Sequence, residues 1–123
     1  MADVPGLLLS RDLLFTVKIA STARELGAHV QVAGNVDLAS ALIAKIQPRA
    51  VFVDLAAGPL VANENLALFQ EQAGADTPFI AFGSHVDAEA LEAARAAGCR
   101  EVMPRSKFTV QLPDLIRRYL TTE

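Results

Sequence analysis

Several short apolar runs of this 123-residue sequence end in polar side chains, and these are the residues that could carry chemistry. The most informative of them is Asp54, an acid directly behind the apolar run Ala50–Val53. The other candidates follow further runs and are Ser10, Arg11, Asp12, Gly83, Ser84, His85, Arg105, Ser106 and Lys107. A carboxylate among hydroxyls and cations could accept a phosphoryl group, help to bind an anion, or form an internal ion pair.

Hydrolase chemistry is the first alternative, because Asp54, Ser84 and His85 are an acid, a nucleophile and a base. Ser84 and His85 are adjacent, however, and no Gly-x-Ser-x-Gly motif surrounds Ser84. We therefore expect that this protein is not an enzyme. Ser84 is instead predicted to make a turn hydrogen bond, and His85 to be exposed in a loop.

The segments that must position these residues alternate between short apolar runs and longer stretches with helical spacing. Nearly continuous apolar runs are typical of parallel strands that are covered on both faces. The predicted strands are Leu7–Leu9, Ala28–Ala33, Ala50–Val53, Pro78–Phe82 and Glu101–Met103.

The intervening stretches predict amphipathic helices. Asn35 or Asp37 is expected to start the second helix and Asp87 to cap the fourth. Two helices are placed at Asn63–Ala73 and Ala88–Ala97. The expected apolar faces of the others are Phe15, Ile19, Thr22 and Leu26 in the first, Leu38, Leu42 and Ile46 in the second, and Leu112, Leu115, Ile116, Tyr119 and Leu120 in the last.

Five strand–helix units predict an α/β fold with a single domain over residues 1–123. Right-handed crossovers favour a flavodoxin-like, five-stranded parallel sheet in the order 2-1-3-4-5, with helices on both faces. In such a sheet the functional crevice lies outside the carboxyl ends of the first and third strands. The candidate residues should therefore gather at one edge of the sheet.

Composition excludes several classes of function. A net charge of −3 does not favour binding to nucleic acid. The beginning of the chain has no basic segment ahead of an apolar one, and no apolar run reaches membrane-spanning length, so we expect a cytoplasmic protein without a membrane partner. Cys99 is the only cysteine, which excludes an intrachain disulfide and a multi-cysteine zinc site.

Over essentially its full length, the chain resembles the receiver (CheY-like) domain of bacterial response regulators. Asp54 stands at the phospho-acceptor position of that family, and Ala94–Gly98 matches its small-residue stretch before the fifth strand. Leu26 and Gly27 end the first helix at the usual distance from the first strand. The resemblance implies a module of two-component signal transduction and phosphorelay.

The metal-binding acids of the family are missing, because their positions fall on Ser10 and Arg11. Asp12 is the one acid nearby that could replace them. Magnesium prefers hard oxygen ligands that include carboxylates, whereas Arg11 is a cation. We expect Arg11 or Arg105 to pair directly with Asp54 and to supply the missing positive charge. We expect no cofactor, and magnesium only if Asp54 is phosphorylated.

The switch residues of the family have also changed. The Ser/Thr position after the fourth strand falls on Gly83, with Ser84 one place late. The lysine after the fifth strand falls on Arg105, and the proline that follows it falls on Ser106. The resemblance is therefore to a receiver that lacks most of the phosphorylation machinery.

From these residues we predict a stand-alone, atypical pseudo-receiver that acts through protein–protein interaction, without magnesium-dependent phosphorylation of Asp54. One alternative is a small-anion or nucleotide-binding module that uses a cationic rim of Arg11, Arg105 and Lys107. Another is a phospho-accepting receiver with an altered metal site at Asp12 and Asp54. The resemblance implies that other signalling proteins, or a second copy in a homodimer, would bind the face formed by the fourth helix, fifth strand and fifth helix.

Overall fold

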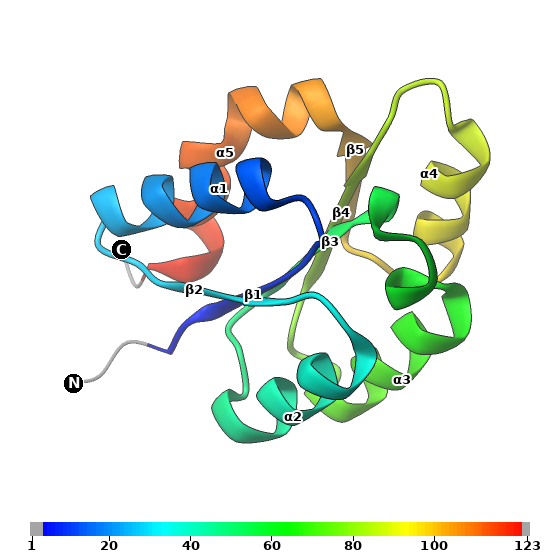
Figure 1. The fold of residues 1–123 in the computed structure, drawn as a ribbon, viewed down its shortest axis with the longest axis horizontal. Helices are drawn as coiled ribbons and strands as arrows, with labels where there is room; N and C mark the ends of the chain where they lie inside the picture. Colours follow the sequence, from blue (N-terminus) through cyan, green and yellow to red (C-terminus); the bar gives the residue numbers. More distant parts are fainter. Residues whose placement is uncertain (1–3, 122–123) are drawn as a thin grey trace.

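The computed structural model describes residues 4–121, which contain a five-stranded parallel sheet in the order β2-β1-β3-β4-β5 (Figure 1). The strands are β1 (Gly6–Leu9), β2 (Val30–Ala33), β3 (Val51–Asp54), β4 (Phe79–Gly83) and β5 (Glu101–Pro104). The predicted fold class and strand order are confirmed. Residues 1–3 and 122–123 of the predicted domain lie outside the described part of the chain.

Helices cover both faces of this sheet. They are α1 (Leu13–Glu25), α2 (Val36–Ile46), α3 (Asn63–Ala73), α4 (Ala88–Ala96) and α5 (Arg105–Leu120). Helices α1 and α5 lie on one face, whereas α2, α3 and α4 lie on the other (Figure 1). A 3₁₀-helical segment that the sequence did not predict, η1 (Leu55–Val61), follows β3 directly and is kinked at Gly58, whose φ of 66° is not helical.

The three central strands β1, β3 and β4 are almost entirely apolar because their side chains alternate between two separate cores. Leu7 and Leu9 of β1 pack with α2, α3 and α4, whereas Leu8 packs with α1 and α5. Val53 and Phe52 of β3 divide in the same way. Since both faces are buried, neither can tolerate the polar alternation of a half-exposed strand.

Side-chain caps fix where the helices begin. Asp12 Oδ1 accepts a hydrogen bond from the backbone N–H of Phe15 at 3.0 Å and thereby starts α1. Asn35, one of the two predicted starts of α2, caps that helix, and Asp87 caps α4 as predicted. Gly27 follows α1 with φ of 82°, a conformation that glycine adopts without strain.

Two sequence predictions are wrong in detail. In α2 the buried residues are Ala39 and Ile43, whereas Leu38 is 42 % exposed. Successive residues of a helix are rotated by only 100° about its axis. The apolar spacing therefore does not decide whether the side that contains Leu38 or the side that contains Ala39 packs on the sheet. The second strand begins at Val30 and not at Ala28, because the Ala28 N–H bonds back to Ala23 O at the end of α1.

Candidate functional site

Asp54 is the last residue of β3, and its side chain is closed off from solvent. The residue is only 2 % exposed. Its Oδ2 accepts a hydrogen bond from Ser10 Oγ at 2.8 Å, and its Oδ1 accepts one from the Ala56 N–H at 3.0 Å. Both carboxylate oxygens therefore have partners inside the protein, and Asp54 serves as the N-cap of η1.

Ser10 joins the ends of two neighbouring strands. It follows β1, which pairs with β3, so the topology brings it beside Asp54. Ser10 is itself 2 % exposed. Its hydroxyl donates to Asp54 and accepts from the Asp12 N–H at 3.2 Å. A neutral hydroxyl thus occupies the place where a receiver would need an acid.

Arg105 pairs with Asp12 and not with Asp54. Its Nη2 donates to Asp12 Oδ2 at 2.7 Å, and its guanidinium lies 4.1 Å from the centroid of the Phe15 ring. The Phe15 N–H, and then Arg105, hold the pKa of Asp12 below its ordinary value. The predicted ion pair of Arg11 or Arg105 with Asp54 is therefore wrong. At the partly exposed Asp12 a guanidinium keeps more of its hydration than it would at the buried Asp54.

The position of the receiver switch is filled by packing. A Cβ placed on Gly83 would lie 3.1 Å from Leu55 Cβ, so a Ser or Thr there would require Leu55 to move. The next residue, Ser84, accepts a hydrogen bond from the Val86 N–H at 3.3 Å, which confirms the predicted turn. His85 is exposed, also as predicted.

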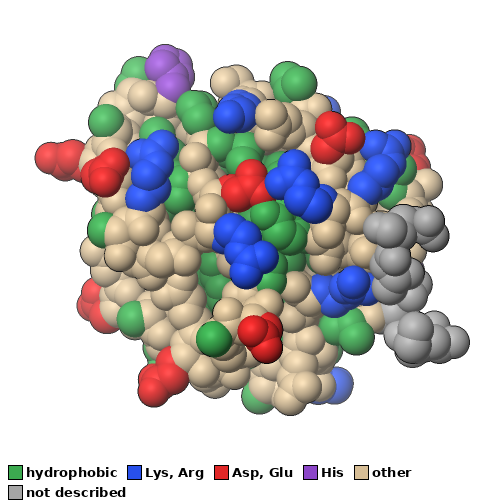
Figure 2. All heavy atoms as spheres, turned by 180° about the vertical axis from the view of Figure 1, so that it is seen from behind, with side chains coloured by type: hydrophobic (Ala, Val, Ile, Leu, Met, Phe, Trp, Pro, Cys, Tyr) green, Lys and Arg blue, Asp and Glu red, His purple; other side chains and the backbone are tan. Residues whose placement is uncertain are grey.

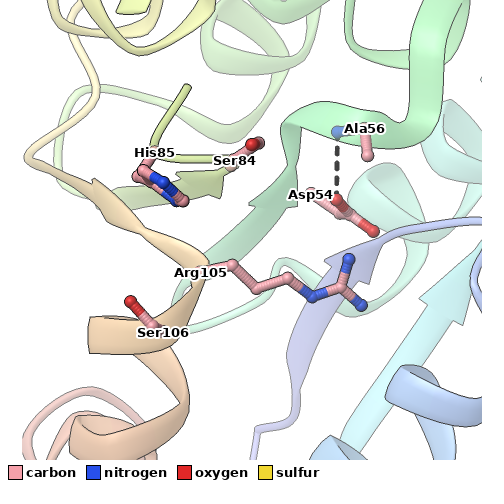
Figure 3. Close-up of a pocket in the computed structure, with 7 residues that line it drawn as sticks. Asp54, Ala56, Ser84, His85, Arg105 and Ser106 are labelled. Atoms are coloured by element: carbon pink, nitrogen blue, oxygen red, sulfur yellow. Dashed lines mark hydrogen bonds between the residues drawn. The ribbon is translucent and has the colours of Figure 1, made fainter. Parts of the chain in front are cut away.

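A hollow of about 250 Å³ lies above this site, at the carboxyl ends of β3, β4 and β5. Its lining contains Asp54, Ala56, Gly83, Ser84, His85, Arg105 and Ser106. In Figure 3, Arg105 extends from the start of α5 to the side of Asp54, while Ser84 and His85 come from the loop after β4. The structure therefore brings together six of the ten predicted site residues here.

Arg11 lies at a different hollow, also of about 250 Å³, with Gly34, Asn35, Val36, Pro59 and Leu60. Lys107 is exposed and lines neither hollow. The cationic rim expected from Arg11, Arg105 and Lys107 is thus divided between two places. Sequence reasoning also missed the N-cap roles of Asp12 and Asp54, although an acid just before a helical segment signals such a cap.

The donors around Asp54 do not fit a divalent cation. Magnesium takes oxygen ligands in a near-octahedral arrangement, usually with more than one carboxylate or phosphate group. Asp54 instead contacts a hydroxyl and an N–H, and Arg105 brings a positive charge to the same hollow. Among residues 4–121, no three Asp, Glu, His or Cys side chains are grouped as a metal site would need.

The side of the molecule turned away in Figure 1 is where β5 forms the edge of the sheet. Figure 2 shows basic side chains on this side around an apolar area with acidic groups within it. Glu101 Oε2 accepts a hydrogen bond from Arg118 Nη1 at 2.6 Å and another from the Tyr119 hydroxyl. Burial, and then Glu101, raise the pKa of Tyr119. This cluster fixes α5 against β5.

No helix within residues 4–121 has the length and apolarity needed to cross a membrane. The single thiol, Cys99, is buried, and burial raises its pKa to about 11. The thiol is therefore protonated at neutral pH.

No protein-family model matches the sequence, and no curated protein does. Solved structures match nearly the whole chain. The receiver domain of NtrX from Brucella abortus has a TM-score of 0.80 and 20 % identity, covering 96 % of this chain and 99 % of that one. The receiver domain of the sensor histidine kinase PA1611 from Pseudomonas aeruginosa, with magnesium in its active-site cleft, has a TM-score of 0.76 and 19 % identity, covering 97 % and 98 %.

A third match is the receiver domain of a response regulator from Saccharomyces cerevisiae, co-crystallised with a histidine phosphotransfer protein. It has a TM-score of 0.77 and 16 % identity, covering 96 % of this chain and 89 % of that one. The chain therefore has the fold of response-regulator receiver domains. At these identities the likeness concerns the fold, and the chemistry has to be argued from the residues of this chain.

Proposed function

We propose that this chain is an atypical receiver-like signalling module that acts through contacts with other proteins and does not accept a phosphoryl group at Asp54. The observation that carries the proposal is the state of the Asp54 carboxylate. It is 2 % exposed, and both its oxygens already accept hydrogen bonds, from Ser10 and Ala56. With so little of the residue exposed, a phosphoryl donor has poor access to either oxygen.

The charges around Asp54 support the same proposal. Phosphoryl transfer depends on positioning and on neutralising the charge of the transferred group, usually with a metal ion. The metal-binding positions of a receiver hold Ser10 and Arg11, and the nearest acid, Asp12, is paired with Arg105. Releasing Asp12 for a metal would leave a guanidinium without its partner. The loss of this ion pair on metal binding argues against the alternative of a phospho-accepting receiver with an altered metal site at Asp12 and Asp54.

The test is incubation with acetyl phosphate or beryllofluoride in the presence of magnesium. We expect the intact mass and the amide NMR spectrum to remain unchanged, because Asp54 is almost completely buried and its neighbour Ser10 does not replace an acidic magnesium ligand. A receiver that keeps both metal-binding acids serves as the positive control, and Asp54→Asn as the matched negative one. Stoichiometric modification of the wild-type chain that is absent in Asp54→Asn would contradict the proposal.

The surface that we assign to protein contacts is the face of α4, β5 and α5, and we propose a second copy of the chain as its occupant. Small side chains on α4 permit close approach, and β5 presents a free sheet edge. Ala96→Arg places a long charged side chain at an exposed position of α4, while Ala67→Arg makes the same change at an exposed position of α3. In sedimentation equilibrium, Ala96→Arg should weaken a dimer that Ala67→Arg leaves intact. A monomeric wild type would refute self-association.

Binding of a small anion or a nucleotide is the second candidate, favoured by the hollow of Figure 3. Arg105, Ser84 and Ser106 bring a cation and two hydroxyls to it. Sulfate or ATP should then raise the melting temperature of the wild type but not of Arg105→Gln. We also propose a cytoplasmic location, where the single thiol of Cys99 would remain reduced.

A further inference from the structure

The second hollow, beside Arg11, is formed by the segments that follow the neighbouring strands β1, β2 and β3, and it is separate from the Asp54 hollow. Arg11 comes from the loop after β1, Gly34 from the connection between β2 and α2, and Val36 from the first position of α2. Pro59 and Leu60 belong to η1, which follows β3. The two hollows share no lining residue. A ligand in this one would therefore touch none of the groups that line the other.

The polar part of the lining is cationic. Arg11 is exposed, and the ion pairs formed among residues 4–121 involve other arginines. The side-chain oxygen of Asn35 is already used, because it accepts the Leu38 N–H at 2.8 Å. No Asp or Glu lines the hollow. The guanidinium of Arg11 is thus the group that would select a ligand by charge, and it selects an anion.

The rest of the lining is apolar and held in place. Val36 is half-buried against the core, and Leu60 is only 4 % exposed. Pro59 is fixed by its carbonyl oxygen, which accepts hydrogen bonds from Asn65 Nδ2 at 2.7 Å and from the Ala62 N–H at 3.2 Å. A preformed apolar wall favours a ligand that carries a compact aliphatic group.

We propose that this hollow binds a small carboxylate with a branched aliphatic side group. The carboxylate would pair with the Arg11 guanidinium, and the aliphatic group would pack on Val36, Pro59 and Leu60. A volume of about 250 Å³ is below that of drug-sized pockets, so the ligand is small. A free branched-chain acid and the carboxyl-terminal residue of a peptide share this chemistry. The site does not depend on whether Asp54 accepts a phosphoryl group.

Titration of the ¹⁵N-labelled full chain followed by amide NMR tests the proposal. Isovalerate provides both recognition elements, whereas isovaleramide keeps the shape and lacks the charge, and acetate keeps the charge and lacks the branched group. We expect saturable shifts at Gly34, Asn35 and Val36 with isovalerate, and weaker binding of the other two. Equal binding of isovaleramide, or no saturable shift at tens of millimolar, would overturn the proposal.

A second arm distinguishes the two sources of the ligand. A short acetylated peptide that ends in leucine is compared with its carboxyl-terminal amide. Binding of the free-acid peptide at least about tenfold tighter than isovalerate identifies a protein terminus, and the reverse order identifies a free acid. Either result supports the site, while indistinguishable binding of the acid and amide peptides counts against it.

Substitutions of single arginines test whether isovalerate binds in the hollow beside Arg11. Arg11→Gln should weaken isovalerate by about tenfold or more, because the charged hydrogen bonds are lost. Arg100→Gln is the matched control, since Arg100 is also exposed but lies before β5. Both changes are at exposed positions, so folded variants are expected. Unchanged affinity in Arg11→Gln, or loss of binding in Arg105→Gln instead, would place the ligand elsewhere and refute the proposal.

Discussion

Replacing Ser10 by aspartate tests whether the absence of a second carboxylate beside Asp54 is what prevents this site from binding magnesium. Ser10 Oγ lies 2.8 Å from Asp54 Oδ2, so the variant sets a second carboxylate against one that is 2 % exposed. Two unit charges about 4 Å apart repel by about 4 kcal/mol at an effective dielectric constant of about 20. The hydrogen bond to the charged acceptor, about 1.5–3 kcal/mol, is lost as well. Protonation of one of the two carboxylates relieves part of the repulsion. We therefore expect the free energy of unfolding of Ser10→Asp to be lower than that of the wild type by at least about 3 kcal/mol in metal-free buffer.

Magnesium should recover much of this loss, because a divalent cation between two carboxylates turns repulsion into attraction. A ligand present at about 100 times its Kd stabilises the folded state by about 2.7 kcal/mol. Urea unfolding followed by circular dichroism, with EDTA or with excess magnesium, measures both states. Ser10→Asp should gain stability with magnesium, and the wild type should not.

Ser10→Asn is the matched control, because it has nearly the same size as the aspartate and carries no charge. It should lose less stability than Ser10→Asp in EDTA and show no response to magnesium. The reasoning would be refuted if the two variants behave alike, since charge beside Asp54 would then not be the deciding property. It would also be refuted if magnesium stabilised the wild type to the same extent.

Three further outcomes follow from the same region and its surroundings. Gly83→Thr should cost about 1–3 kcal/mol in urea unfolding, because its Cβ would lie 3.1 Å from Leu55 Cβ, and Leu55→Ala should recover part of that cost. The pKa of Asp12 is lowered, so the pair with Arg105 stabilises the fold above the unfolded-state pKa of about 3.9 and is lost as the pH falls through the folded-state value. The stability gap between the wild type and Asp12→Asn should accordingly be constant above about pH 5 and close in stronger acid. With its pKa raised to about 11, Cys99 should react slowly with iodoacetamide at pH 8 in the folded protein and quickly in urea, as mass spectrometry would show.

The fold could be predicted from the sequence because its three central strands are buried on both faces. A run such as Leu7–Leu9 has no polar position, and in a soluble domain only a doubly covered strand or a buried helix accommodates it. The exposed Leu38 marks the limit of this reasoning. The helix α2 buries Ala39 and Ile43 and leaves Leu38 largely exposed, although the apolar spacing of the sequence is compatible with either face.

The positions of the site residues were predictable, whereas their partners were not. Strand order alone placed Ser10 and Asp54 at the ends of adjacent strands. The choice of Asp12 as the partner of Arg105 depends on side-chain reach, on burial and on the ring of Phe15 beneath the guanidinium. None of these quantities can be read from spacing. The helix η1 was missed for a related reason, since Gly58 and Pro59 in its interior are typical of a turn.

Tyr119 gives the chain a built-in optical reporter. The sequence has one tyrosine and no tryptophan, so emission excited near 280 nm would come from this side chain alone. Its hydroxyl donates to Glu101, and its ring lies 5.4 Å from the Arg118 guanidinium. A molecule that covers the outer side of β5 and α5 would disturb this contact and change the fluorescence. Occupancy of that surface can therefore be followed in unlabelled protein, without first knowing what binds.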